Sequence, residues 1–302
     1  MGEGLLLLAV GTFAGVLAGF LGIGGGTVMV PAMVALGLSG VEAVGTSTLA
    51  VLIISLGGSV QNWRMGFLKV KNALLLGLPS VVTAFVGTTL ASRVPEYVLL
   101  GIFGIFLLVN IYLVGVKKRV VAQATLAPPT PSPVSPASPN PQKNTPIPAP
   151  ASGRGEVSSP TDTGGTPAGL GIPAPTMPPI LARGIIGGTA GFLAGLFGIG
   201  GGVVLVPMQI VLLRETIKTA IQTSLGAIVI TALSACTWHT LQGNVVGPTG
   251  LLLGLGGLVG VQGSTRYLPR LPDAIVTLMF RGLLAFFALF FFYRAWGSFM
   301  AS

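Results

Sequence analysis

Long apolar stretches, each about as long as a membrane helix, alternate with short polar turns at both ends of the chain. In the first half, no Lys, Arg, Asp or Glu occurs within residues 4–41, 43–63, 72–92 or 97–116. In the second half, Arg281 is the single charged residue within 184–213, 219–265 and 274–293. A helix needs roughly 20 apolar residues to cross a bilayer. The pattern therefore predicts an all-α polytopic membrane protein.

Each half divides into five apolar segments. In the first half the segments are 4–23, 27–38, 43–61, 72–92 and 97–116. In the second half they are 180–198, 203–213, 219–238, 245–265 and 274–296. The second member of each set is too short for a comfortable span. We therefore expect about eight full spans and two short segments, 27–38 and 203–213, which either cross the membrane or re-enter it.

The two halves are copies of one unit. The stretch "AGVLAGFLGIGGGTVMVP" at 14–31 returns as "AGFLAGLFGIGGGVVLVP" at 190–207, with 13 of 18 positions identical. After a one-residue gap the match continues at an offset of 177, so that "AVGTSTLA" at 43–50 meets "AIQTSLGA" at 220–227. "RVPE" at 93–96 likewise meets "RLPD" at 270–273. The duplication predicts two structurally related repeats.

The region between the repeats has a different composition. Residues 122–179 are rich in Pro, Ser, Thr and Gly and have no hydrophobic periodicity. Such a segment cannot bury enough apolar surface to offset the entropy of ordering it. We expect three parts: a first membrane repeat at 1–121, a disordered linker at 122–179 and a second membrane repeat at 180–302.

The basic residues favour repeats of opposite orientation. Lys and Arg accumulate on the cytoplasmic side of membrane proteins. If each short segment reverses the chain, thirteen basic residues lie inside and two outside, with Arg281 left within the membrane. If the short segments do not cross, the count is ten inside and five outside. The sequence thus predicts inverted-topology repeats with glycine-broken short helices, an arrangement that recurs in secondary transporters.

Composition excludes several other classes of protein. Only 8% of residues are charged, and the net charge of +9 resides mostly at the ends of apolar runs rather than in a patch for nucleic acid. One cysteine, Cys236, and one histidine, His239, cannot form a disulfide or a metal cluster. We expect no cofactor, no metal and no enzymatic activity. His239, beside Trp238 at a segment end, is expected to lie at the membrane interface.

The triple glycines are the candidate substrate site. A broken helix leaves backbone N–H groups that, with the helix dipole, favour an anion. Hydroxyls near the start of the following helix add donors, and Arg281 adds a charge. The predicted residues are Gly24, Gly25, Gly26, Thr46, Ser47, Gly200, Gly201, Gly202, Thr223, Ser224 and Arg281. Three alternatives stay open: the glycines serve packing alone, the hydroxyls bond to carbonyls of their own helices, and Arg281 snorkels to the interface or pairs with helix-end carbonyls.

Packing is the expected role of the glycines upstream. Gly11, Gly15 and Gly19 recur every fourth residue, as do Gly187, Gly191 and Gly195 in the second repeat. Small residues at this spacing let membrane helices approach closely.

These features resemble one known family. "GFLGIGGGTVMVP", its duplicate, the "TS" that opens the next helix and the "RMG" before the fourth segment are similar to the sulfite exporter family, TauE/SafE. The resemblance covers both repeats and leaves out the linker. It implies a multi-pass inner-membrane transporter that exports small sulfur-containing anions such as sulfite, sulfonates or thiosulfate. Family members are usually described with fewer than ten spans.

Two other functions stay open on the sequence alone. The chain could be an anion channel whose pore is lined by the glycine breaks, or a membrane scaffold subunit without transport turnover. The partners expected in either case are the lipid bilayer and a small anion. Homo-oligomerisation is left open.

Overall fold

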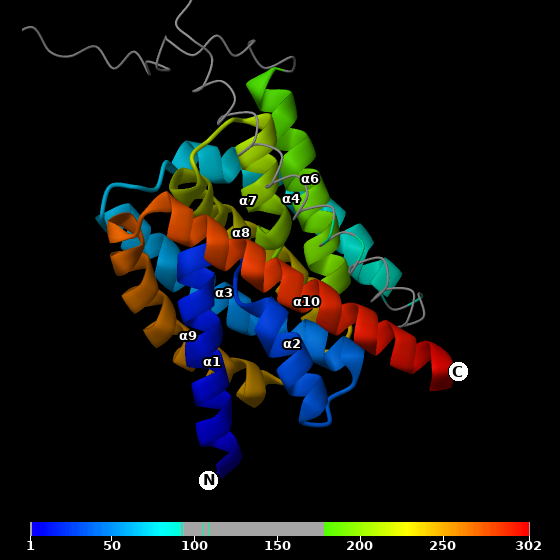
Figure 1. The fold of residues 1–302 in the computed structure, drawn as a ribbon. Helices are drawn as coiled ribbons and strands as arrows, with labels where there is room; N and C mark the ends of the chain where they lie inside the picture. The colour runs from blue at the N-terminus through cyan, green and yellow to red at the C-terminus, as the bar shows by residue number, and fades with distance from the viewer. Residues whose placement is uncertain (1, 92, 94–104, 106–107, 109–177, 302) are drawn as a thin grey trace, which may run out of the picture. The chain divides into compact units, whose positions relative to one another are not determined.

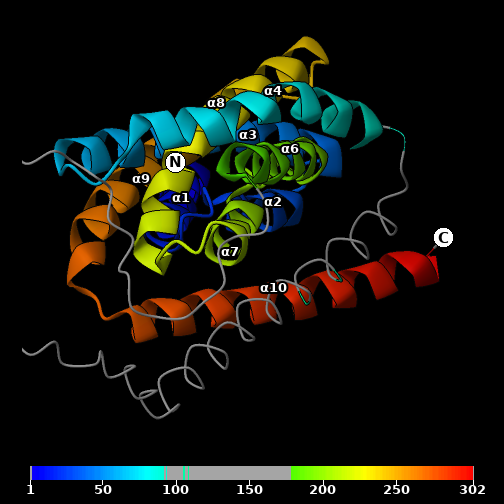
Figure 2. The same ribbon diagram turned by 90° about the horizontal axis from the view of Figure 1, so that it is seen from above.

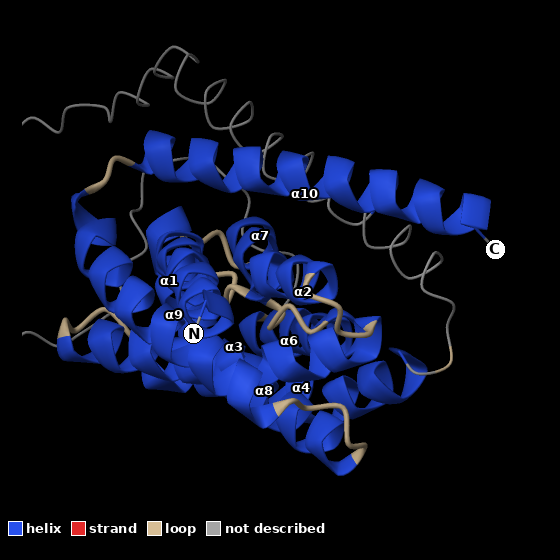
Figure 3. Ribbon diagram, turned by 90° about the horizontal axis from the view of Figure 1, so that it is seen from below, coloured by secondary structure: helices blue, strands red, loops and turns tan. Residues whose placement is uncertain are grey.

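A computed structural model describes residues 2–91, 93, 105, 108 and 178–301. Within these residues the chain is helical and has no strand (Figures 1 and 3). The α-helices of the first repeat are α1 (Gly2–Leu21), α2 (Gly26–Ala35), α3 (Gly40–Arg64) and α4 (Val70–Ala91). Those of the second are α6 (Pro179–Phe197), α7 (Gly202–Leu212), α8 (Ile217–Leu241), α9 (Gly247–Tyr267) and α10 (Asp273–Ala301), with the short 3-10 helix η1 (Leu268–Arg270) before α10.

The predicted segments correspond to these helices one by one wherever the chain is described. Apart from residues 105 and 108, the segment 97–116 lies outside the described residues, as does nearly all of the predicted linker. Six described helices are long and apolar enough to cross a membrane, namely α1, α3, α4, α6, α8 and the part of α10 up to Phe290. The helix α9 spans 21 residues but is not among them. The structure therefore supports a multi-pass helical protein, while the count of eight spans stays a prediction.

Local sequence signals set the helix starts. Ser39 accepts a hydrogen bond from the Glu42 backbone, and the Glu42 carboxylate accepts one from the Ser39 backbone, which completes a capping box at α3. Thr216 caps α8 through the Thr219 backbone. Such caps satisfy N–H groups that have no partner within the helix.

Glycines of α1 and α6 lie at close range against a helix from the other repeat, most of them against its backbone. Along α1 and α9 the facing pairs are Gly11 with Leu253, Gly15 with Gly257, and Gly19 with Ser264. Along α6 and α4 they are Gly187 with Leu76, Gly191 with Ser80, and Gly195 with Ala84. At each position a Cβ atom would collide with the facing residue. The packing role predicted for these glycines is confirmed.

The order of these contacts gives the helix directions. Residue numbers rise together along α1 and α9, and along α6 and α4, so each pair is parallel. Helix α3 also runs parallel to α9, because Gly45 faces Asn244 and Gly58 faces Val261. Helix α8 runs parallel to α4, because Gly226 faces Ala73 while Gly77 faces Ile230.

The two sets of helices run in opposite directions. Val51 of α3 and Ile228 of α8 lie together beside Gly24, and Gly58, further along α3, faces Leu225, earlier in α8. Helices α3 and α8 therefore cross antiparallel. In Figure 1, α1 rises from the N-terminus at the bottom, whereas α6 descends from the top.

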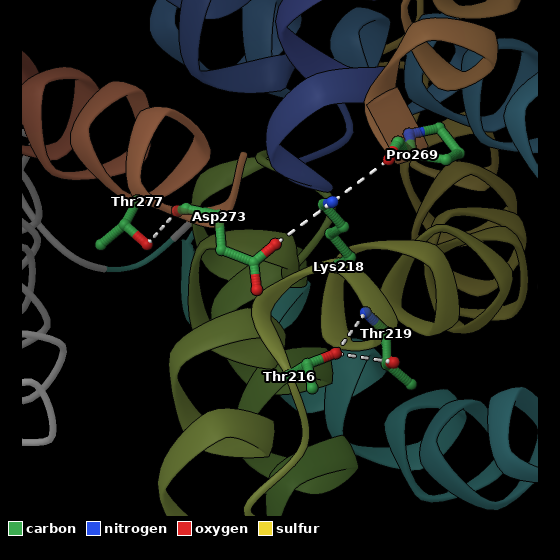
Figure 4. Close-up of polar contacts among 6 residues, drawn as sticks. All are labelled: Thr216, Lys218, Thr219, Pro269, Asp273 and Thr277. Atoms are coloured by element: carbon green, nitrogen blue, oxygen red, sulfur yellow. Dashed lines mark hydrogen bonds and ion pairs between the residues drawn. The ribbon is translucent and has the colours of Figure 1, made fainter. Parts of the chain in front are cut away.

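Helix α10 packs beside α1, α2 and α7 (Figures 2 and 3). Its buried residues Val276, Phe280, Leu284 and Ala288 recur every four positions and join the core cluster that includes Val203 and Val206 of α7. Its start is held by Lys218 of α8, whose ammonium lies 3.3 Å from the Asp273 carboxylate and donates to the Pro269 carbonyl at 3.2 Å (Figure 4). An apolar cavity of about 650 Å³ remains between α1, α2 and α10.

Two glycines of α6 provide a matched test of the close helix packing. A methyl group at Gly187 would strike the Leu76 carbonyl, whereas one at Gly184 would meet nothing within 4 Å. We expect Gly187→Ala to destabilise the protein by about 1–3 kcal/mol, as overpacking does. Gly184→Ala should be neutral or slightly stabilising, because alanine has the higher helix propensity. Thermal denaturation in detergent measures both, and equal midpoints for the two variants would contradict the packing.

Candidate anion site

The two triple-glycine motifs meet. A Cβ atom on Gly26 would lie 2.6 Å from the Gly198 carbonyl oxygen and 2.8 Å from the Ile199 Cα atom. On the other side, a Cβ atom on Gly202 would strike the Gly22 carbonyl oxygen and lie 2.6 Å from the Ile23 Cα atom. The loop that precedes each short helix therefore packs on the first residue of the other short helix. Both loops are fully buried.

The backbone conformation also requires glycine at the helix starts. Gly25 precedes α2 with φ 82°, and Gly201 precedes α7 with φ 74°. This left-handed region is costly for residues with a Cβ atom. The left-handed backbone and the contact between the two loops thus explain many of the glycines in the two motifs. The anion-binding role predicted for Gly24, Gly25 and Gly26 and for Gly200, Gly201 and Gly202 stays a prediction.

Each predicted serine lies against the glycine motif of the other repeat. The Ser47 hydroxyl lies 2.8 Å from the Gly198 carbonyl oxygen and 2.7 Å from that of Val44. The Ser224 hydroxyl donates to the Ala220 carbonyl at 2.6 Å, and a Cβ atom on Gly22 would lie 3.1 Å from it. The structure thus brings the two serines to the glycine loops, across the interface between repeats.

Among the described residues, no hydrogen bond joins the predicted threonines to the serines or to the glycine loops. The Thr46 hydroxyl accepts a hydrogen bond from the Val246 backbone N–H at 2.9 Å. That bond joins the start of α3 to the residue just before α9. Thr223, the equivalent residue of α8, is buried with 1% of its surface exposed. Thr46 therefore has a structural role that sequence reasoning did not anticipate.

Arg281 lies on α10 with its side chain half-buried. The preceding residue, Phe280, fills the core with 1% of its surface exposed. Among the described residues, no recorded hydrogen bond or ion pair joins Arg281 to the glycine loops. Its predicted part in the site stays a prediction.

The surroundings of the loops are mainly apolar. Val51 and Ile228, equivalent residues of α3 and α8, flank both Gly24 and Gly200. Thr27, in the first turn of α2, is 1% exposed, and its hydroxyl has no hydrogen-bond partner among the described residues. The equivalent residue of α7 is Val203. The difference between "GGGT" and "GGGV" was the sequence signal for this buried hydroxyl.

His239 lies in the last turn of α8, at a segment end as the sequence indicated. Its side chain is fully buried near Gly195 of α6 rather than exposed as an interfacial anchor, and its level relative to the membrane interface stays a prediction. The equivalent residue of α3, Asn62, is also fully buried. The small residues of α6 leave room for a ring from α8, a contact that arises between helices and has no local sequence signal.

One carboxylate outside the spanning helices has a perturbed titration. Glu215 lies in the turn between α7 and α8. Burial raises the pKa of its carboxyl, and the positive charges of Arg183 and Lys69 partly oppose that rise. Two basic residues, from the start of α6 and the turn before α4, thus lie near one acid at the same end of their helices.

The fold and the helix lengths together define a multi-pass, all-helical membrane protein. The chain belongs to the sulfite exporter TauE/SafE family, whose model matches residues 7–291. The resemblance seen in the glycine motifs is thereby confirmed over nearly the whole chain.

Three curated relatives carry the name "Probable membrane transporter protein". The one from Bacillus subtilis, YunE, is 24% identical over 255 residues, which cover 80% of each chain. The one from Methanocaldococcus jannaschii is 26% identical over 235 residues, covering 76% of this chain and 69% of the relative. A Haemophilus influenzae relative is 35% identical over 111 residues, 34% of this chain and 42% of the relative, so less than half of that protein is matched. No solved structure matches the chain.

Proposed function

We propose that the protein is a secondary transporter that exports small sulfur-containing anions, such as sulfite, sulfonates or thiosulfate, across the inner (cell) membrane. The observation that carries this proposal is the meeting of two glycine-broken short helices, one from each repeat, at buried loops. Paired broken helices at a repeat interface are the common substrate site of secondary transporters. The family description, sulfite exporter, supports the substrate class.

The proposed site uses backbone donors rather than a buried cation. Gly24–Gly26 and Gly200–Gly202 precede or begin α2 and α7, whose N-termini carry partial positive charge. Ser47 and Ser224 have hydroxyls at the same loops, and each would turn its single O–H from a backbone carbonyl to a bound anion. A small oxyanion held there would be contacted from both repeats. Because the loops also pack on one another, binding requires that the repeats separate slightly, as alternating access does.

The proposed topology is inverted. If α1, α3 and α9 run outward to inward, α4, α6 and α8 run inward to outward. The described basic residues that then lie on one face are Arg64, Lys69, Lys71, Arg183, Arg214, Lys218, Arg266 and Arg270. The described basic residues at the other face are Arg93 and Arg294 of α10. We name the first face the basic face, and the positive-inside tendency assigns it to the cytoplasm.

Transport assays test the substrate class. We expect proteoliposomes containing the full chain to take up radiolabelled sulfite or thiosulfate at a rate that saturates with concentration. Preloading with the unlabelled anion should accelerate uptake by counterflow, because a carrier returns loaded faster than empty. Protein-free liposomes are the control. A flux that neither saturates nor shows counterflow would identify a channel, and absence of flux for every sulfur anion would contradict the transporter.

Cysteine labelling tests the inverted topology. Lys69 and Gln242 lie in equivalent turns, after α3 and after α8, and both are exposed. In a Cys236→Ala background, Lys69→Cys should react with an impermeant maleimide only from the cytoplasmic side, and Gln242→Cys only from the opposite side. Labelling of both residues from one side would rule out the inversion.

Substitutions at Thr46 distinguish a structural role of its hydroxyl from a role in binding the anion. Thr46→Val leaves the Val246 N–H without its partner, which we expect to cost about 1–3 kcal/mol. Thr46→Ser keeps the hydroxyl and should melt like the parent. Thermal denaturation without sulfite measures the loss of stability, and the shift on adding sulfite measures binding. A Thr46→Val protein that melts normally but loses its stabilisation by sulfite would make Thr46 a ligand instead.

A further inference from the structure

A second cavity lies between the ends of α3 and α9, and none of its lining residues belongs to the glycine loops. Its volume is about 480 Å³. Its lining residues are Gln61 of α3, Gln262, Gly263, Arg266 and Tyr267 of α9, and Arg270 of η1. Since α3 and α9 both end here, the cavity opens on the basic face.

The cavity presents hydrogen-bond donors and positive charge. None of the lining residues is acidic. Two guanidinium groups each offer a planar set of N–H donors that matches an oxyanion, and two glutamine amides add further donors. The Arg270 guanidinium lies 5.6 Å from the centre of the Tyr267 ring, close enough for a cation–π contact that orients it.

The equivalent place in the other repeat is filled. At an offset of 177, Gln61 and Gln262 correspond to Trp238 and Phe85. Those two rings pack together, with centroids 4.3 Å apart. Arg266 corresponds to Thr89, whereas Arg270 keeps its equivalent in Arg93. The helix pair α3 and α9 therefore carries a cationic cavity, whereas the equivalent pair α4 and α8 carries an aromatic contact.

The difference cannot come from the backbone, because the fold repeats the helix pair. It comes from the side chains, which differ at five of the six lining positions, and three of these substitutions replace two rings and a threonine by two amides and an arginine. All three add groups that donate hydrogen bonds or charge at one side only. A lipid-facing crevice would need none of them, whereas an anion approaching from one side would be attracted by all of them.

We propose that this cavity is an oxyanion-binding vestibule on the basic face, where Arg266 and Arg270 with Gln61 and Gln262 hold a small sulfur oxyanion before it reaches the glycine loops. The proposal rests on the proposed function for its ligand. Sulfite and sulfonates present three oxygens to the guanidinium forks and amides. A phospholipid phosphate offers the same chemistry from the membrane and is the other source of such a ligand.

Binding to the full chain in detergent tests the vestibule. The probes are sulfite, methanesulfonate and inorganic phosphate, titrated against the thermal midpoint, and phosphatidylglycerol, followed by native mass spectrometry. Arg266→Gln and Arg270→Gln should each weaken sulfite or methanesulfonate binding at least tenfold, the loss expected for a hydrogen bond to a charged ligand. Arg64→Gln, an exposed arginine at the end of α3 outside the cavity, is the matched control and should bind like the parent.

The other possible outcomes each support or overturn the vestibule. Equal binding by the parent and both cavity variants would overturn the vestibule, and saturable uptake by the same parent would leave the transporter standing. If Arg64→Gln weakens anion binding as much as the cavity variants do, the effect comes from general surface charge and the vestibule is overturned. Loss of phosphatidylglycerol alone would assign the cavity to lipid and overturn the proposal. A parent that neither binds nor transports any sulfur anion would overturn both. Arg266→Lys, which keeps the charge, should recover only part of the affinity if the fork geometry matters.

Discussion

The contact on which this structure depends is the approach of one helix backbone to another where glycine leaves no Cβ atom between them. In a membrane, lipid tails are as apolar as leucine, so helices gain little from burying apolar side chains against each other. Close contact between backbones provides the packing instead. Gly15 against Gly257 and Gly191 against Ser80 hold the first helix of each repeat to the fourth helix of the other. The repeats thus interlock rather than stand side by side, and the crossing of α3 and α8 is placed between them.

The same property of glycine brings the two broken helices together. Gly26 and Gly202 allow each short helix to begin against the loop of the other, and Ser47 extends from α3 to the Gly198 carbonyl. Packing and the proposed binding therefore use the same residues. A substitution at these glycines affects both, whereas the hydroxyl groups beside them can be changed one at a time. Thr27, buried without a hydrogen-bond partner among the described residues, adds a polar atom on one side of this junction.

Duplication gives the two repeats a common backbone, and side-chain differences make the two faces unlike. The aromatic pair Phe85 and Trp238 occupies the place that Gln262 and Gln61 occupy on the basic face. Glu215, whose pKa burial raises, has Leu38 as its equivalent. The repeats share one fold, but the side chains that they present at the two faces differ. These substitutions give one face a positively charged cavity and the other a packed aromatic pair.

The sequence alone determined the class of protein, the duplication, the nine described helices and the family, because apolar run length and repeated motifs are local properties of the chain. It also indicated that Gly11, Gly15 and Gly19 pack closely, since their spacing places them on one helix face. Tertiary structure alone decided which helix they face, that Thr46 bonds to Val246, that His239 is buried and that Arg266 and Arg270 share a cavity with Gln61. Several of those outcomes join residues 200 positions apart or more, as in the bond from Val246 to Thr46. Such partners are chosen by the packing of whole helices, which no short stretch of sequence encodes.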